Sequence, residues 1–345
     1  MKIAVLLSGG VDSSLALKLL KDQGHELHAF YLKIWLEDEL QFLGECPWED
    51  DLKYARQICA DLDLPLEIVP MQRQYFDTVV DYTIKEVRAG RTPNPDIMCN
   101  SMIKFGLFMD QIDESFDKIA SGHYAQTFQQ DGITYLKKSP DALKDQTYFL
   151  ARLTQKQLQR IIFPIGHLTK TEVRDLAALH NLPNQNRKDS QGICFLGKFR
   201  YDDFLRAHLG TKKGDLINFD TNEKVGTHDG FYYYTIGQRK GIGLSGGPWY
   251  VVAKDCAKNQ VFISSTYHEQ KPRDTVNLAN FHWFSGQKPP QQSLQVKLRH
   301  GEQLHNCTFT DDHTIKLAEN DQGIAPGQFA VFYDQELCLG SAVIA

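Results

Sequence analysis

The sequence Leu7-Ser8-Gly9-Gly10-Val11-Asp12-Ser13-Ser14 connects an apolar run at residues 3–7 to an amphipathic run at residues 14–21. Two glycines permit a tight turn and a close approach of the backbone, and free N–H groups at the start of a helix attract an anion. The serine hydroxyls add donors for phosphate oxygens. The stretch therefore predicts a phosphate-binding loop between a strand and a helix. It contains no lysine, which argues against γ-phosphoryl transfer of the Walker type.

The first half of the chain alternates short apolar runs with amphipathic ones. After the loop we expect strands at residues 27–35, 66–69 and 118–121 and helices at residues 50–62 and 75–87. In the first of these helices, apolar residues three and four positions apart form one face. Strands that alternate with helices indicate an α/β domain with a doubly wound parallel sheet.

The second half has a different pattern. Thr169 and Glu172 form a capping-box signature, which predicts a helix that ends before Pro183. Beyond about residue 200, short β-like runs such as 230–236 and 260–264 are separated by turn residues, so we expect mainly β structure. We place the domains at residues 1–205, 206–272 and 273–345.

Composition and cysteine spacing narrow the class of protein. Hydrophobic residues make up 42% and charged residues 23% of the chain, as in ordinary globular proteins. No apolar run approaches the roughly 18 residues of a membrane helix, and the N-terminus lacks a signal-peptide pattern, so we expect a cytoplasmic protein without a membrane partner. The formal charge of -5 means that a nucleic-acid partner needs a local basic face. Seven cysteines without Cys-x-x-Cys spacing predict neither a disulfide framework nor a zinc site.

Two stretches present a cysteine in an unusual setting. Two prolines stiffen residues 91–100, so this loop should present Asn94, Asp96 and Cys99 in fixed positions. Cys194 follows two cations within residues 187–195, and nearby positive charge lowers the pKa of a thiol. Taken alone, the residue type of either cysteine favours a small buried hydrophobic residue over a nucleophile.

The loop resembles the pyrophosphate loop (PP-loop) of ATP pyrophosphatases, which split ATP between its α and β phosphates and leave AMP on a substrate oxygen. Over nearly its whole length the chain resembles the tRNA-specific 2-thiouridylases (the MnmA family), which are tRNA thiolases of this type. The resemblance rests on residues 8–14, 91–100, 103–106, 121–124, 144–150, 188–195, 237–241, 248–251 and 325–328. It implies an adenine nucleotide α-hydrolase-like catalytic domain, a small mixed or β central domain that binds tRNA, and a C-terminal β-barrel.

The resemblance also implies roles for individual residues. Cys99 would be the catalytic nucleophile and Cys194 the cysteine that carries a persulfide. Asp96 is our candidate for proton transfer near the base, with a turn-capping role as the alternative. The residues implied to bind ATP are Leu7, Ser8, Gly9, Gly10, Val11, Asp12, Ser13, Ser14, Leu32 and Gly122. The residues implied to contact tRNA are Asn94, Pro95, Asp96, His123, Lys144, Asp145, Gln146, Arg299, His300 and Gln328. Asp12 is the candidate ligand for Mg²⁺ that accompanies ATP, and no tightly bound metal is expected.

The implied reaction is the 2-thiolation of the wobble uridine (U34) of tRNA. ATP would adenylate O2 of the base, and a persulfide on Cys194 would supply sulfur. A cysteine desulfurase or a sulfur relay protein would load that persulfide, and a thiol reductant would reduce a Cys99–Cys194 disulfide afterwards. One alternative is another PP-loop ATP pyrophosphatase with a different acceptor, which needs no paired cysteines. The other is a non-catalytic RNA-binding sulfur carrier, against which the intact Asp12 and both cysteines argue.

Overall fold

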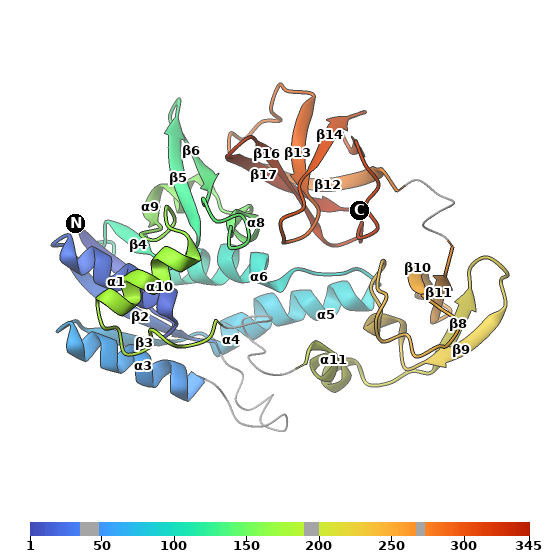
Figure 1. The fold of residues 1–345 in the computed structure, drawn as a ribbon, viewed down its shortest axis with the longest axis horizontal. Coiled ribbons are helices and arrows are strands. Elements are labelled where there is room, and N and C mark those ends of the chain that lie inside the picture. Colours follow the sequence, from blue (N-terminus) through green and yellow to red (C-terminus); the bar gives the residue numbers. More distant parts are fainter. Residues whose placement is uncertain (35–47, 190–199, 267–272) are drawn as a thin grey trace.

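The described residues form three β-sheets (Figure 1). The computed structural model describes residues 1–34, 48–189, 200–266 and 273–345. The first sheet is parallel throughout, with the strand order β3-β2-β1-β4-β7. Its strands are β1 (Lys2–Leu6), β2 (Glu26–Lys33), β3 (Leu66–Pro70), β4 (Lys118–Ala120) and β7 (Ile161–Ile162).

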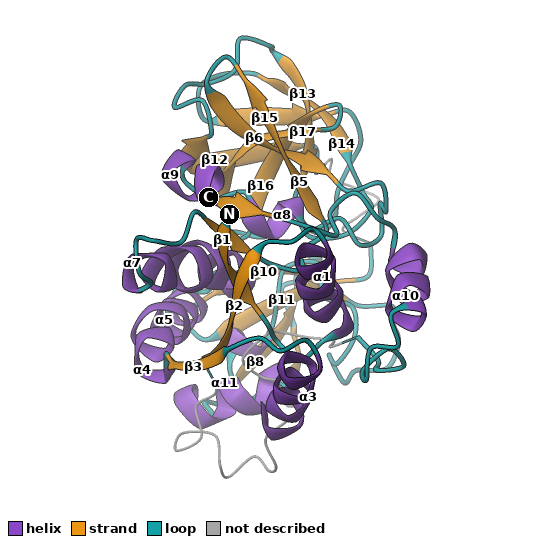
Figure 2. Ribbon diagram, turned by 90° about the vertical axis from the view of Figure 1, so that its left-hand side faces the viewer, coloured by secondary structure: helices purple, strands orange, loops and turns teal. Residues whose placement is uncertain are grey.

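Helices cover both faces of this sheet. Helices α1 (Val11–Asp22) and α3 (Trp48–Asp61) pack on one face, where Leu17 and Ile58 share a core with Val5 of β1. Ala4 and Leu6 point to the other face and join a core built by the helices between β3 and β4. Figure 2 shows α5 and α7 on one side of the strands and α1 and α3 on the other. The predicted doubly wound parallel sheet is confirmed.

The helices between β3 and β4 contain two π-helical segments. The segment predicted as one helix at 75–87 consists of α4 (Gln72–Tyr75), η2 (Phe76–Val80) and α5 (Asp81–Arg88). It is followed by α6 (Pro95–Met98), η3 (Cys99–Leu107) and α7 (Phe108–Gln111). Helices η2 and η3 have π geometry, which is rare and occurs often at functional sites. The first of them interrupts the regular α-helix that the spacing predicts.

Among the described residues, four further α-helices follow β4 in the chain. They are α8 (Thr147–Leu150), α9 (Gln155–Arg160), α10 (Lys170–Leu179) and α11 (Tyr201–Leu209). The predicted capping box opens α10, because the Thr169 side chain accepts a bond from the N–H of Glu172 at 3.3 Å and the Glu172 carboxylate accepts one from the N–H of Thr169 at 2.7 Å. The helix ends before Pro183, as the sequence predicts.

The central sheet is small and mixed. Its strands are β8 (Gly214–Asn218), β9 (Lys224–His228), β10 (Tyr250–Asp255) and β11 (Gln260–Ser264), in the order β10-β11-β8-β9. The expectation of β structure at 230–236 is wrong, because a 3₁₀ helix, η4 (Phe231–Tyr233), occupies that segment. The hydroxyls of Tyr232 and Tyr233 both donate to the carbonyl of Gly210, at 2.9 and 2.6 Å, and these bonds stabilise the turn. The alternation of apolar and polar residues in the sequence does not encode such a contact.

The C-terminal strands close into a barrel of six strands, as expected. They are β12 (Thr275–Trp283), β13 (Ser293–Lys297), β14 (His305–Phe309), β15 (Thr314–Leu317), β16 (Phe329–Asp334) and β17 (Leu337–Ile344), and pairing of β12 with β17 closes the ring. The hairpin of β5 (Ala125–Gln130) and β6 (Ile133–Lys138) extends this sheet, because β6 pairs with β17. This hairpin belongs to the segment that we assigned to the first domain, so the barrel and the α/β part share a sheet.

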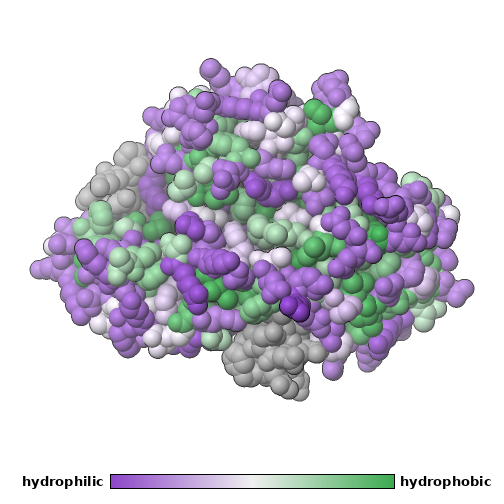
Figure 3. All heavy atoms as spheres, turned by 180° about the vertical axis from the view of Figure 1, so that it is seen from behind, coloured by the Kyte–Doolittle hydropathy of each residue, from purple (hydrophilic) through white to green (hydrophobic). Residues whose placement is uncertain are grey.

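The distribution of hydrophilic and hydrophobic residues on the surface is that of a globular protein. Figure 3 shows one face of the molecule, on which hydrophilic residues predominate and hydrophobic residues lie in small groups between them. Within the described ranges, no helix combines the length and the apolar character needed to cross a membrane.

Candidate nucleotide and tRNA site

The predicted phosphate loop lies where the strand order of the parallel sheet reverses. Strand β1 pairs with β2 on one side and with β4 on the other, so the carboxyl ends of β1 and β4 form the topological switch point, where ligands bind in open α/β sheets. Residues 7–10 follow β1, and Gly122 follows β4. A Cβ on Gly122 would lie 2.6 Å from the nitrogen of Ser13, so only glycine permits this close approach. The structure thus brings these two parts of the predicted ATP site together.

The loop leaves the start of α1 open to an anion. Gly10 is the N-cap of α1 and makes no side-chain capping bond, and its own N–H donates to the hydroxyl of Ser8 at 3.4 Å. The serine hydroxyls stay within the loop: that of Ser8 lies 3.1 Å from that of Ser13, and those of Ser13 and Ser14 donate to the carbonyl of Gly10 at 3.1 and 2.8 Å. N–H groups at an uncapped helix start, with the helix dipole behind them, form an anion site.

Two side chains from a distant segment hold the carbonyl of Gly9. Asn184 donates to it at 2.8 Å and Arg187 at 3.0 Å, and Asn184 also donates to the hydroxyl of Ser14 at 2.9 Å. Gly9 has a φ of +74°, which favours glycine. In a trans peptide the C=O and the next N–H point in opposite directions, so these bonds direct the N–H of Gly10 away from Asn184. The sequence analysis did not select Asn184.

The carboxylate of Asp12 is held by two groups. Lys170 lies 2.7 Å from Oδ1 of Asp12, and the hydroxyl of Tyr124 donates to the same oxygen at 2.9 Å. Neither partner was predicted, although Lys170 lies within the capping-box stretch. Within the described ranges, no group of three or more His, Cys, Asp or Glu residues could hold a metal ion. A single carboxylate fits Mg²⁺ that arrives on the phosphates of ATP, because Mg²⁺ commonly takes one or two carboxylates together with phosphate oxygens.

Asp189 joins three cations beside the loop. Its carboxylate lies 2.6 Å from Lys144, 2.8 Å from Lys170 and 2.6 Å from Arg174. Burial by itself would raise the pKa of Asp189, but the hydrogen bonds from Lys144 and Lys170 outweigh it and lower this pKa to about 2. Lys144, which we predicted to contact tRNA, therefore also belongs to the charged cluster beside the nucleotide loop.

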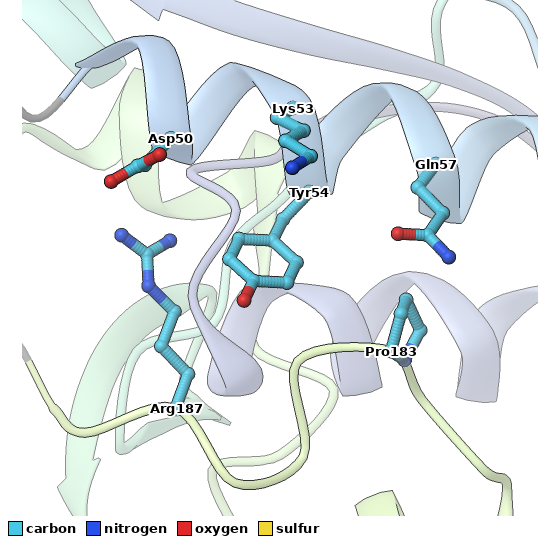
Figure 4. A pocket seen from close by; sticks show the side chains of 6 residues that line it. All are labelled: Asp50, Lys53, Tyr54, Gln57, Pro183 and Arg187. Carbon is cyan, nitrogen blue, oxygen red and sulfur yellow. The ribbon is translucent and has the colours of Figure 1, made fainter.

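A pocket lies on the other side of the 183–187 segment, against α3. Its lining residues are Asp50, Lys53, Tyr54, Gln57, Pro183 and Arg187, and Figure 4 shows the α3 side chains directed toward this segment. Arg187 pairs with Asp51 and lies 5.1 Å from the centre of the Tyr54 ring. Arg187 therefore links α3 to the phosphate loop. Leu32, predicted to flank the nucleotide, is partly buried near the end of β2.

Cys99 is the first residue of η3 and is fully buried. Burial raises the pKa of its thiol to about 11, Lys104 acts in the opposite direction, and Asp96 raises it further. The thiol is therefore protonated near neutral pH in this conformation. Cys194, the other predicted catalytic cysteine, lies outside the described residues.

The predicted tRNA contacts gather where the barrel meets the α/β part. Gln328 donates to the carbonyls of Thr92 and Pro93 at 3.1 and 3.0 Å, and the N–H of Thr92 donates to the carbonyl of Pro326 at 2.7 Å. Asn94 caps α6 by accepting from the N–H of Ile97 at 3.2 Å, and Pro95 occupies the first turn, where its missing N–H has no cost. The barrel thus holds the loop that carries Asn94, Pro95 and Asp96.

A second set of contacts joins the same junction. His300 stacks on Phe149, with ring centres 4.5 Å apart, and burial lowers the pKa of His300. Arg299 pairs with Asp321 at 2.6 Å and keeps 43% of its side-chain surface exposed. Phe149 belongs to α8, which lies between the hairpin of β5 and β6 and the barrel in Figure 1. An exposed guanidinium and an aromatic ring are suitable groups for a phosphate and a base.

Three predicted tRNA contacts have hydrogen-bond or ion-pair partners within the protein. The carboxylate of Asp145 is 2% exposed and pairs with Lys297 at 3.1 Å, so this side chain cannot reach tRNA in this conformation. Gln146 accepts from the N–H of Tyr124 at 2.9 Å. Burial lowers the pKa of His123 well below its usual value, and its Nδ1 lies 2.8 Å from the hydroxyl of Ser121. Local sequence did not reveal these internal partners.

The fold and the loop define a PP-loop α/β nucleotide-binding domain joined to two β domains. Residues 1–198 match the family model "tRNA methyl transferase HUP domain", residues 202–265 the "tRNA methyl transferase PRC-barrel domain" and residues 273–344 the "Aminomethyltransferase beta-barrel domain". The whole chain is 43% identical to the tRNA-specific 2-thiouridylase MnmA of Parabacteroides distasonis, of which it covers 99%. It is 44% identical to MnmA 2 of Bacteroides fragilis and 41% identical to MnmA of Porphyromonas gingivalis, and covers 100% and 99% of them. The chain belongs to the tRNA-specific 2-thiouridylase MnmA family.

Proposed function

We propose that this protein catalyses the ATP-dependent 2-thiolation of the wobble uridine of tRNA. The observation that carries the proposal is the similarity of 41–44% identity, over the whole chain, to proteins named tRNA-specific 2-thiouridylase. The uncapped helix start at Gly10 supports it, because the site favours the phosphates of ATP. The junction of barrel and α/β part offers Arg299 and His300 to the tRNA.

The reaction begins with attack of O2 of uridine on the α phosphorus of ATP. The bond between the α phosphorus and the bridging oxygen to the β phosphorus breaks, pyrophosphate leaves, and AMP is bonded to O2. The terminal sulfur of a persulfide on Cys194 then bonds to C2, directly or as sulfide, and the C2–O bond breaks to release AMP. Attack of the Cys99 thiolate on Sγ of Cys194 breaks the persulfide bond and leaves a Cys99–Cys194 disulfide.

The buried thiol of Cys99 places a condition on these reaction steps. With its pKa raised to about 11, Cys99 needs new surroundings before it can act as a thiolate. Binding of tRNA against residues 92–96 is the event that supplies them, because this loop leads directly into Cys99. Asp96 lies in the first turn of α6 and would move a proton near the base.

The proposal requires further participants. Asp12 would hold Mg²⁺ that comes with ATP, and the ion would offset phosphate charge. A cysteine desulfurase or a sulfur relay protein would load Cys194, and a thiol reductant would reduce the disulfide. We assign residues 1–205 to catalysis, 206–272 to the central tRNA-binding domain and 273–345 to the barrel, and we place the protein in the cytoplasm.

The test is to incubate the protein with unmodified tRNA, ATP, Mg²⁺ and a persulfide source, and to measure AMP and 2-thiouridine by mass spectrometry. We expect 2-thiouridine and AMP to form together. Cys99→Ser and Cys194→Ser should form no 2-thiouridine yet bind ATP as the unmodified protein does. Cys256→Ser is the matched control, since Cys256 lies half-buried in the central domain. AMP without 2-thiouridine in the unmodified protein would refute the proposed acceptor.

A further inference from the structure

The loop lacks a lysine, but the fold supplies one from the other end of the α/β part. Lys170 is the first residue of α10, 158 positions after Asp12 in sequence, and its ammonium reaches the carboxylate of Asp12 at 2.7 Å. Asp12 is the second residue of α1, directly behind the loop. The lysine is therefore beside the start of the helix whose N–H groups form the anion site.

The position of this ammonium is fixed by several independent contacts. Residues Leu15, Ala16, Val173 and Ala177 form a buried core between α1 and α10, which sets the distance between the two helices. The N–H of Lys170 donates to Asp141 at 2.9 Å, and the capping box at Thr169 fixes the start of α10. The Lys170 side chain keeps only 15% of its surface exposed. Such an ammonium loses little conformational freedom when it binds a ligand.

The hydrogen bonds of Lys170 leave room for a ligand. An ammonium has three N–H donors, and in the described part of the chain Asp12 and Asp189 take two of them, at 2.7 and 2.8 Å. Strand β7 precedes α10 and runs parallel to β4, so the start of α10 lies at the same edge of the sheet as the loop. Phosphates bound at that edge bring negative charge next to Asp12, and a cation must offset it.

We propose that Lys170 is a catalytic residue that binds the part of ATP released as pyrophosphate and stabilises the negative charge on it as the α–β bond breaks. This inference rests on the proposed function only in that ATP is split into AMP and pyrophosphate. Bond cleavage places additional charge on the leaving oxygen, and a fixed ammonium there stabilises the transition state more than the bound ATP. Asp12 and Asp189 hold the ammonium in place before ATP binds.

The experiment compares Lys170→Met and Lys170→Arg with the unmodified protein. Binding of inorganic pyrophosphate and of AMP, each with Mg²⁺, is measured by calorimetry, which needs no turnover. For Lys170→Met we expect the Kd for pyrophosphate to rise at least about tenfold and the Kd for AMP to stay within about twofold. The rate of tRNA-dependent AMP formation should fall by about 100-fold or more. Lys170→Arg keeps the charge and should retain most of the pyrophosphate affinity.

Two controls separate binding from folding and from the proposed function. Lys18→Met removes a lysine of α1 that pairs with Asp22 within the same helix, and it should change neither Kd. If Lys170→Met does not fold, as judged by its thermal transition, Lys170→Gln replaces it in the same comparison. Equal changes in the two Kd values, or no change in either, would overturn the role of Lys170. If the unmodified protein forms AMP on another acceptor, the proposed function fails while the pyrophosphate comparison still decides the role of the lysine.

Discussion

Removal of the ammonium of Lys297 should destabilise the junction between the barrel and the α/β part. The carboxylate of Asp145 is 2% exposed and the residue Lys297 is 4% exposed. Nζ of Lys297 lies 3.1 Å from Oδ2 of Asp145, and the hydroxyl of Thr147 donates to the same oxygen at 2.8 Å. Lys297→Met leaves a buried carboxylate without its cation, and the hydroxyl of Thr147 replaces only part of that interaction. We expect a loss of about 3–5 kcal/mol in the free energy of unfolding.

Equilibrium unfolding in urea, followed by tryptophan fluorescence, measures this loss, and Trp283 on β12 reports on the barrel. The matched control is Lys288→Met, because Lys288 pairs with Asp312 at 3.0 Å on the surface of the same barrel with exposed fractions of 38% and 87%. That control should cost less than about 1 kcal/mol. Asp145→Asn in the Lys297→Met background should recover much of the loss, because no charge then remains buried. A loss below about 1 kcal/mol for Lys297→Met, with additive effects in the double variant, would refute the reasoning.

Two other predictions concern the nucleotide loop and the buried thiol. Asn184→Ala removes the two hydrogen bonds that Asn184 donates to the carbonyl of Gly9 and the hydroxyl of Ser14. The KM for ATP in AMP formation should therefore rise about tenfold, with a smaller change in kcat, and an unchanged KM would contradict the role of these bonds. Near neutral pH, iodoacetamide should modify Cys99 at least about 100-fold more slowly in the folded protein than in urea, because the pKa of the thiol is raised from 9.0 to about 11. The rate in the folded protein should increase as the pH rises toward 11. Equal rates in the folded protein and in urea, measured by mass spectrometry, would show that the thiol is accessible.

Features that depend on neighbouring residues were predicted from the sequence. The turn between β1 and α1 and the capping box of Thr169 and Glu172 are confirmed, because their hydrogen bonds join residues a few positions apart. The parallel sheet is also confirmed, since alternating strands and helices restrict the chain to right-handed crossovers. The 3₁₀ helix at Phe231–Tyr233 was missed because its tyrosines bind a carbonyl about 20 positions away.

The resemblance to a family named candidate residues, but it could not describe their surroundings. It selected Asp145 as a tRNA contact, whereas the structure buries its carboxylate against Lys297, 152 positions away. It selected Gln328, and the structure shows that this side chain holds the carbonyls of Thr92 and Pro93, more than 230 positions away. Such partners depend on how the domains pack, which no local pattern encodes.

The sequence by itself determined that this protein has a glycine-rich loop at the end of a buried strand, two cysteines in unusual settings, and an α/β part followed by β structure. The tertiary structure alone decided which charges meet at that loop. Lys170 and Asp189 reach Asp12 and its surroundings because the strand order places β7 and α10 at the edge where β1 ends. Hydrogen-bond and turn preferences act over a few residues, whereas the sheet order and the packed cores bring together charges that lie more than 150 positions apart.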